Sequence, residues 1–289
     1  MVWKGLATVA TMTAERILYR GMTRAALDAA YNNMAAVLNS AEKLAEWTGR
    51  SAALKARSDP ALLDLAYGPK PRQKIDLFRC GRDGAALLVF IHGGYWQRNS
   101  KDVFGCMAQG PLAHGLDVAL IGYTLAPEAR VTDIIAEVAA GIAWLRRQGP
   151  AHGVAAARLI VSGWSAGGHL AATAIGLPEV DAGLSISGVF DLEPCRLNYL
   201  NDKLGLGEAE ARAASPMHHP PPASAPLVIA YGTAELAELQ RQSRDFAAAW
   251  GARGLPVATE PLEGRDHFSI LEELARPDGR LAQAVARLA

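Results

Sequence analysis

The chain has 289 residues, of which 50% are hydrophobic and 20% are charged, so it contains ample material for a large buried core. Its 29 basic and 29 acidic residues give a formal net charge of zero, and no long basic run occurs, which argues against nucleic acid as a partner. No apolar run approaches the roughly 20 residues that span a bilayer, so no insertion into a membrane is expected.

The cysteines and the first residues indicate a cytoplasmic protein. Cys80, Cys106 and Cys195 are scattered and form no CxxC pair, so reduced thiols are expected rather than a disulfide framework or a zinc knuckle. Residues 1–12 lack a leucine-rich core and run directly into charged residues. A cleaved signal peptide is therefore not expected.

Residues from 13 to about 58 are predicted to be helical. Thr23 is a suitable N-cap for an amphipathic helix over 24–31, residues 32–33 interrupt it, and a second helix begins at Ser40. Because these helices precede the first strand, they must pack on a body that forms from later residues. They are predicted to be a lid, and a simple decoration of the core is the alternative.

The first clear strand covers residues 74–80, where apolar and polar residues alternate. A turn of the hairpin type follows at 82–84. Residues 86–91 are continuously apolar, which is typical of a central strand covered on both faces.

From there helical and strand patterns alternate to the C-terminus. Helices are predicted at 101–113, 132–146, 238–253 and the C-terminal end, and strands at 117–123, 158–163, 182–188, 226–232 and 256–262. The proline-rich residues from about 191 to 224 are predicted to be an irregular insertion over the sheet. The alternation predicts one α/β domain over residues 1–289, with a mostly parallel sheet and helices on both faces.

Residues 163–167 read Gly-Trp-Ser-Ala-Gly between a predicted strand and a predicted helix. A serine on such a turn, with glycine two positions before and after it, is the nucleophile elbow of α/β-hydrolases. The glycines are needed because side chains there would collide with the neighbouring strand and helix. The pattern alone is only moderately specific, so Ser165 becomes a candidate nucleophile only if the chain also supplies a base, an acid and an oxyanion hole.

His267 is the candidate base. Of the seven histidines it alone lies in the loop between the last predicted strand and the last helix, where the base of this fold is expected. His218 and His219 are adjacent, but no carboxylate or cysteine spacing supports a metal site around them, so none is predicted.

Glu235 is the preferred candidate for the acid because it lies three residues beyond the strand that should precede this group. Glu238 falls within the following predicted helix, and it and Asp191 are the fallback candidates. Asp266 is too close to His267 in sequence to orient its ring easily.

The oxyanion of a tetrahedral intermediate requires preorganised N–H donors. Gly93 and Gly94, which end the apolar strand at 86–91, are the candidate donors together with Ala166, the residue after the nucleophile. Four aromatic residues are predicted to contact substrate: Tyr95, Trp96, Trp164 and, from the N-terminal helices, Tyr31. Each of these aromatic residues could equally belong to the core, and Tyr95 is the strongest candidate.

Four segments together resemble the arylformamidase (kynurenine formamidase-like) branch of the α/β-hydrolases, which is related to the hormone-sensitive-lipase-like esterases. They are HGGYW at 92–96, GWSAG at 163–167, YTLAPE at 123–128 and LDAAYNN at 27–33. The resemblance extends from about residue 16 to the C-terminus. It implies hydrolysis of aryl formamides or small acyl esters without a metal or an organic cofactor, and it suggests a homodimer.

By position the resemblance implies Ser165 as nucleophile, Glu235 as acid and His267 as base. The family often carries aspartate where Glu235 stands, which makes this assignment the least secure of the three. The resulting hypothesis is a serine hydrolase that removes a formyl or short acyl group from an aromatic amide or ester through an acyl-enzyme. The alternatives are a general short-chain carboxylesterase and a catalytically dead hydrolase fold used for binding.

Overall fold

The computed structural model describes residues 16–155 and 157–289. The expectation about a signal peptide falls on residues 1–12, outside the described part of the chain. Within that part, no helix is both long and apolar enough to cross a membrane.

The described residues form an eight-stranded sheet in the order β1-β2-β4-β3-β5-β6-β7-β8. Strands β1 and β2 pair antiparallel with their neighbours, and all other pairs are parallel. The strands are β1 (Leu65–Ala66), β2 (Lys74–Phe78), β3 (Leu87–Ile91), β4 (Asp117–Ile121), β5 (Leu159–Trp164), β6 (Ala182–Ile186), β7 (Leu227–Gly232) and β8 (Val257–Leu262). The prediction of a mostly parallel sheet is thereby confirmed.

The predicted hairpin at 82–84 is wrong. Strand β2 pairs with β4, and β4 lies between β2 and β3 in the sheet. Residues 79–86 form a connection long enough to carry the chain from β2 past β4 to β3. A hairpin-type turn in the sequence therefore joins two strands that are not neighbours.

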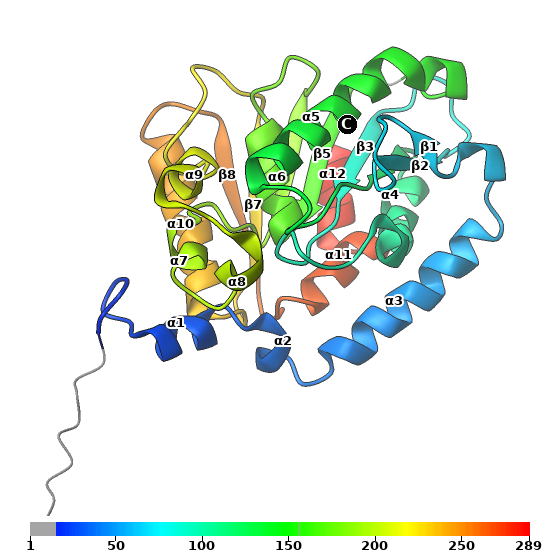
Figure 1. Ribbon diagram of the computed structural model, residues 1–289. Helices are drawn as coiled ribbons and strands as arrows, with labels where there is room; N and C mark the ends of the chain where they lie inside the picture. The colour runs from blue at the N-terminus through cyan, green and yellow to red at the C-terminus, as the bar shows by residue number, and fades with distance from the viewer. Residues whose placement is uncertain (1–15, 156) are drawn as a thin grey trace, which may run out of the picture.

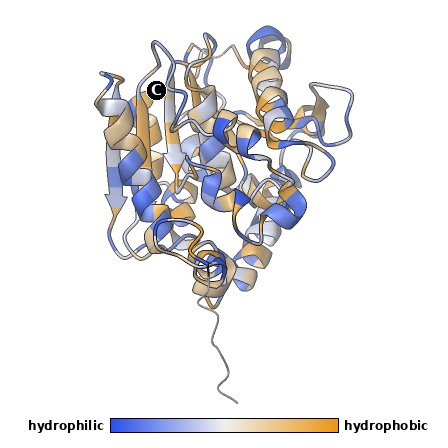
Figure 2. Ribbon diagram, turned by 60° about the vertical axis from the view of Figure 1, so that its left-hand side comes forward, coloured by the Kyte–Doolittle hydropathy of each residue, from blue (hydrophilic) through white to orange (hydrophobic). Residues whose placement is uncertain are grey.

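Helices cover both faces of the sheet, as Figure 1 shows, with α5 and α6 on the near face and α12 behind. Side chains of β3 alternate between the two sides: Leu87, Val89 and Ile91 belong to the hydrophobic cluster that includes residues of α5 (Val131–Gln148), α6 (Ala166–Ala174) and α10 (Ala237–Gly251). Leu88 and Phe90 pack on the other side with α11 (Glu272–Ala275) and α12 (Arg280–Leu288). Two buried faces explain why this strand is apolar throughout, and Figure 2 shows the apolar segments on the central strands.

The helix expected at 101–113 consists of two parts, the 3₁₀ helix η2 (Lys101–Ala108) and the short α4 (Gln109–Ala113). Pro111 lies within α4 and has no N–H to donate, which is consistent with the break in regular hydrogen bonding before it.

The N-terminal segment forms α1 (Arg24–Ala30), α2 (Asn33–Ala36) and α3 (Ser40–Lys55). Helix α3 is fastened to the body at three points along its length. The Trp47 indole donates to Glu272 at 2.6 Å, the Ser51 hydroxyl donates to a carbonyl of η2 at 2.9 Å, and Lys55 forms an ion pair with the buried Asp76 at 2.6 Å. These contacts hold α3 against the rest of the domain along the length of the helix.

The insertion between β6 and β7 contains three short helices, α7 (Glu193–Arg196), α8 (Asn201–Leu204) and α9 (Glu208–Ala213). It was expected to be irregular, and helices of four to six residues are too short to produce a periodic pattern in the sequence. The insertion is tied to the body by hydrogen bonds such as the one from His169 Nε2 to the carbonyl of Ala214, 2.7 Å.

Candidate active site

Ser165 occupies the sharp turn between β5 and α6, with φ 58° and ψ −117°. Its backbone N–H donates to the carbonyl of Ile186 at 2.8 Å. A Cβ atom at Gly163 would lie 2.2 Å from the carbonyl oxygen of Gly167, and one at Gly167 would lie 2.0 Å from that of Ile91. Because no larger residue fits at either position, the two glycines allow the turn that presents Ser165 at the start of α6.

His267 lies in the loop between β8 and η4 (Ser269–Leu271) and faces Glu235. Its Nδ1 atom is 3.5 Å from Glu235 Oε2, and the two side chains are 4% and 0% exposed. The distance is long for a hydrogen bond, as is common for catalytic hydrogen bonds in unliganded enzymes. The other carboxylate oxygen, Oε1, accepts hydrogen bonds from the Gly232 backbone at 2.9 Å and from the Ser187 hydroxyl, which fixes the carboxylate toward the imidazole.

The two fallback candidates and Asp266 have different partners. Glu238 binds Arg241, Asp191 accepts from the Tyr19 hydroxyl, and Asp266 accepts from the backbone N–H of Phe268. Among the described residues, Glu235 is therefore the carboxylate that faces His267.

Gly93 packs directly against the elbow. A Cβ atom there would lie 2.5 Å from the carbonyl oxygen of Trp164 and 3.0 Å from Ser165 Cβ. Within the described residues the backbone N–H groups of Gly93 and Gly94 have no hydrogen-bond acceptor. The N–H of Ala166, the first residue of α6, has no acceptor within its helix. The Ser165 turn and the Gly93–Gly94 loop that packs against it thus provide three backbone N–H groups without an acceptor in the described part of the chain.

The buried side chain of His92 packs against this loop and stabilises it. The His92 ring stacks on Tyr123 with ring centroids 4.3 Å apart, and its Nδ1 lies 2.9 Å from the carbonyl of Gly93. The Tyr123 hydroxyl donates to the carbonyl of His92 at 2.8 Å. Burial lowers the pKa of His92 to about 4, so the ring is neutral at pH 7 and its Nδ1–H donates to the Gly93 carbonyl.

Ser165 and His267 line the same cavity, which has a volume of about 230 Å³. Its walls are mainly apolar and aromatic, with several polar groups. The lining residues are Asn33, Met34, Leu44, Gly94, Tyr95, Arg98, Asn99, Trp164, Ser165, His267 and Phe268.

Comparisons with known proteins agree with this geometry. A family model described as BD-FAE matches residues 76–187. The kynurenine formamidase of Salmo salar is 30% identical over 244 residues, which cover 78% of this chain and 81% of the relative. The chain belongs to the kynurenine formamidase family.

This family membership makes the protein a serine hydrolase of the α/β-hydrolase fold, and two further relatives agree with the fold or the class. Esterase LipC of Mycobacterium tuberculosis is 28% identical over 254 residues, covering 77% of this chain and 63% of that protein. A solved structure of a candidate thioesterase from Silicibacter sp. TM1040 superposes with a TM-score of 0.81 at 28% identity, covering 89% of this chain and 97% of the other. The predicted fold and class of enzyme are confirmed.

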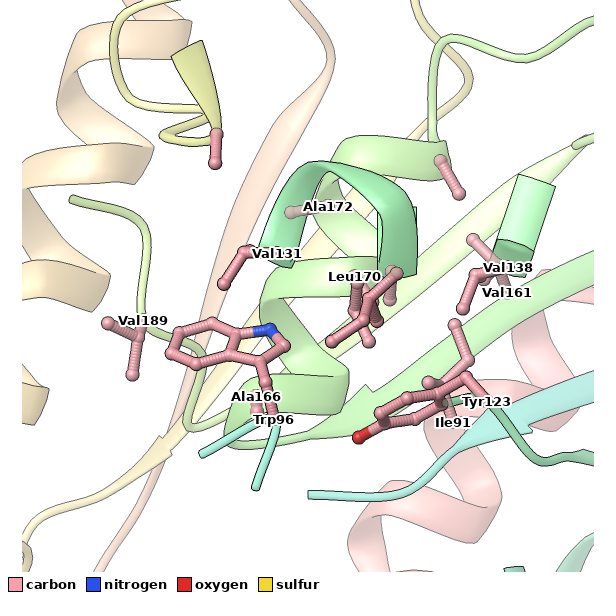
Figure 3. Packing of buried hydrophobic residues seen from close by; sticks show 14 of the residues in the cluster. Ile91, Trp96, Tyr123, Val131, Val138, Val161, Ala166, Leu170, Ala172 and Val189 are labelled. Atoms are coloured by element: carbon pink, nitrogen blue, oxygen red, sulfur yellow. The ribbon is translucent and has the colours of Figure 1, made fainter. Parts of the chain in front are cut away.

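Of the four aromatic residues predicted to contact substrate, Tyr95 and Trp164 line the cavity of this formamidase-family chain, whereas Trp96 and Tyr31 do not. Figure 3 shows the Trp96 indole in the core, close to the labelled Ala166, Val131 and Val189. Trp96 Nε1 donates to His169 Nδ1 at 3.3 Å.

The backbone explains why two adjacent aromatic residues differ. Tyr95 and Trp96 both have positive φ, 50° and 58°, so the chain turns tightly and sends one side chain to the cavity and the other into the core. Tyr31 is buried, and its carbonyl accepts the Tyr95 hydroxyl at 2.8 Å. Asn33 Nδ2 donates to the same hydroxyl at 2.9 Å. Tyr31 therefore supports the cavity wall through Tyr95 and is not itself part of it.

Sequence reasoning missed several residues of the site. The missed lining residues are Asn33, Met34, Leu44, Arg98, Asn99 and Phe268, and Ser187 was missed as a partner of Glu235. Only Phe268 could have been found from its place in the chain, because it adjoins His267. The others come from segments that the fold alone brings together.

The adjacent histidines His218 and His219 lie in the insertion, away from this cavity. His218 Nε2 is 3.6 Å from Asp191 Oδ1. Within residues 16–155 and 157–289, no group of three or more histidine, cysteine, aspartate or glutamate side chains is arranged to hold a metal ion.

Proposed function

We propose that the protein removes a formyl or other short acyl group from an aromatic amide or ester through an acyl-enzyme on Ser165. The observation that carries the proposal is that Ser165, His267 and Gly94 line one aromatic-walled cavity, with Glu235 facing His267. The likeness to a protein named kynurenine formamidase supports the formamide as the bond that is cleaved.

In the proposed mechanism His267 accepts the hydroxyl proton of Ser165 as the oxygen attacks the acyl carbon. Glu235 faces Nδ1 of His267 and stabilises the imidazolium, which leaves Nε2 for the proton transfer. The backbone N–H groups of Gly93, Gly94 and Ala166 stabilise the oxyanion. His267 then protonates the departing aromatic amine or alcohol, and water repeats the cycle to release a small acid such as formate.

The cavity walls suit a flat leaving group. The Trp164 indole lies beside His267, with ring centroids 4.8 Å apart, and donates to the His267 carbonyl at 2.8 Å. Met34 and Leu44 from the N-terminal helices also line the cavity. We therefore propose that the N-terminal helices α1 to α3 cover the site and do not move away from it. They would then be a lid, as predicted from the sequence, and also a packed part of the core, which was the alternative.

A general short-chain carboxylesterase is the second candidate, favoured by the likeness to an esterase over most of the chain. The ratio of kcat/KM for N-formylkynurenine to that for phenyl acetate separates the two. A formamidase gives a ratio well above one, and a large preference for phenyl acetate contradicts the formamidase proposal. A binding protein without catalysis would hydrolyse neither substrate and would resist a fluorophosphonate probe.

We also propose a cytoplasmic location, because Cys80, Cys106 and Cys195 are free thiols in the described structure. The family resemblance supports a homodimer, which light scattering coupled to gel filtration would test. A monomeric mass at micromolar concentration contradicts that part of the proposal.

A further inference from the structure

Arg98 lines the cavity and belongs to a turn that several hydrogen bonds hold in place. Its backbone N–H donates to the carbonyl of Gly94 at 3.0 Å. On one side of it the Gln97 side chain donates to the carbonyl of Leu200 at 2.8 Å, and on the other Asn99 Nδ2 donates to that of Gly93 at 3.2 Å. The turn is thus anchored to the proposed oxyanion loop, so the position of Arg98 relative to Ser165 is set by the loop itself.

The Arg98 guanidinium has no hydrogen-bond or ion-pair partner within the described residues, and the residue is exposed. Among the described residues, no carboxylate lines the cavity, and the side chain of Glu235 is fully buried. The described lining of the cavity therefore contains one permanent positive charge, that of the exposed Arg98, and no negative charge.

Neighbouring groups respond to this charge. Burial raises the pKa of the Tyr95 hydroxyl well above its usual value, and the positive charge of Arg98 opposes that rise. The same opposing effect of Arg98 acts on the pKa of Tyr199, which burial also raises. The positive charge of Arg98 therefore acts on Tyr95, a residue of the cavity wall.

We propose that Arg98 binds a carboxylate on the leaving group, so that the preferred substrates are acylated aromatic amines that carry an acidic substituent. This inference rests on the proposed function and narrows its substrate class. The aromatic ring would lie along the apolar wall near Trp164 and Tyr95, with its carboxylate at the exposed side. The planar guanidinium offers two parallel N–H donors, which match the two oxygens of a carboxylate.

Arg98 is a specificity-determining residue in this account and takes no part in proton transfer. Its contact with the carboxylate exists equally in the ground state and the transition state, so its loss should appear mainly in KM rather than in kcat. Because Arg98 is exposed, the contact should also weaken as salt is added.

The test compares formamidobenzoates with the corresponding formamidobenzamides, which differ in charge but have similar shape, using all three ring isomers. For the isomer that fits best, the wild-type protein should prefer the carboxylate by about tenfold or more in kcat/KM. The Arg98→Gln variant should bring this ratio close to one through a higher KM, and Arg98→Lys should retain part of it. Arg147→Gln, which removes an exposed arginine at the end of α5, is the matched control and should leave the ratio unchanged.

Equal rates for both members of every wild-type pair, or an unchanged ratio in Arg98→Gln, would overturn the inference. Failure of the proposed function gives a different result from failure of the role of Arg98. If all formanilides stay intact while aryl acetates are cleaved, the formyl preference is wrong, and the same ratio measured on acetoxybenzoates and acetoxybenzamides decides the role of Arg98.

Discussion

Replacing Glu235 by glutamine tests the proposed acid while changing almost no volume. Glu235 Oε1 accepts hydrogen bonds from the Gly232 backbone and the Ser187 hydroxyl, so the amide oxygen of the glutamine should keep this place. The amide NH₂ must then face His267 Nδ1, where the carboxylate oxygen Oε2 stood. Two donors cannot pair, so His267 is driven to the tautomer with its proton on Nε2.

That tautomer cannot accept the proton of Ser165. In serine hydrolases the equivalent exchange lowers kcat by about 10⁴ while leaving the geometry intact. A loss of 10³ to 10⁴ corresponds to about 4 to 5.5 kcal/mol of transition-state stabilisation. Because both hydrogen bonds to Oε1 survive, we expect the free energy of unfolding to change far less than this.

The assay is kcat and KM for N-formylkynurenine and phenyl acetate, together with a urea unfolding curve for each protein. Glu238→Gln is the matched control because Glu238 binds Arg241 and not His267. It should retain activity within a few-fold of wild type. Near-normal kcat in Glu235→Gln, or a collapse of kcat in Glu238→Gln with the fold intact, would refute the assignment of the acid.

Gly93→Ala should lower kcat/KM by about 10² or more, because its Cβ atom would lie 2.5 Å from the Trp164 carbonyl oxygen and displace the loop. Gly49→Ala is the control, because its Cβ atom would meet no atom within 4 Å. Equal kcat/KM values for the two variants would contradict the role of the loop. Burial lowers the pKa of His92 and of His169 to about 4, below the value of about 6.5 in an unfolded chain. The unfolded state therefore binds more protons, and the free energy of unfolding should fall as pH drops from 6.5 to 4, by about 3 kcal/mol per histidine. Urea midpoints that stay constant over this range would contradict the prediction.

The sheet and the elbow could be predicted because their causes are local in the sequence. A strand buried on both faces must be apolar throughout, and the turn at Ser165 leaves no space for a side chain at Gly163 or Gly167. The pairing of β2 with β4 has no such local cause. It brings Asp76 of β2 to Lys55 of α3 at 2.6 Å, a contact that only the complete fold forms.

The candidate site was predictable in part for the same reason. The order of Ser165, Glu235 and His267 along the chain follows the order of the strand ends that carry them. The walls of the cavity follow no such order, since Met34 and Arg98 meet there from different segments. The opposite directions of Tyr95 and Trp96 depend on two positive φ angles, which no residue pattern indicated.

The proposed function requires that Ser165 forms the acyl-enzyme. The most direct measurement is intact-protein and peptide mass spectrometry after brief treatment with a fluorophosphonate probe. We expect one adduct per chain, located on the peptide that contains Ser165, with loss of hydrolysis in proportion to labelling. A folded Ser165→Ala variant should form no adduct. An adduct on another residue, or hydrolysis by Ser165→Ala at the wild-type rate, would contradict this role of Ser165.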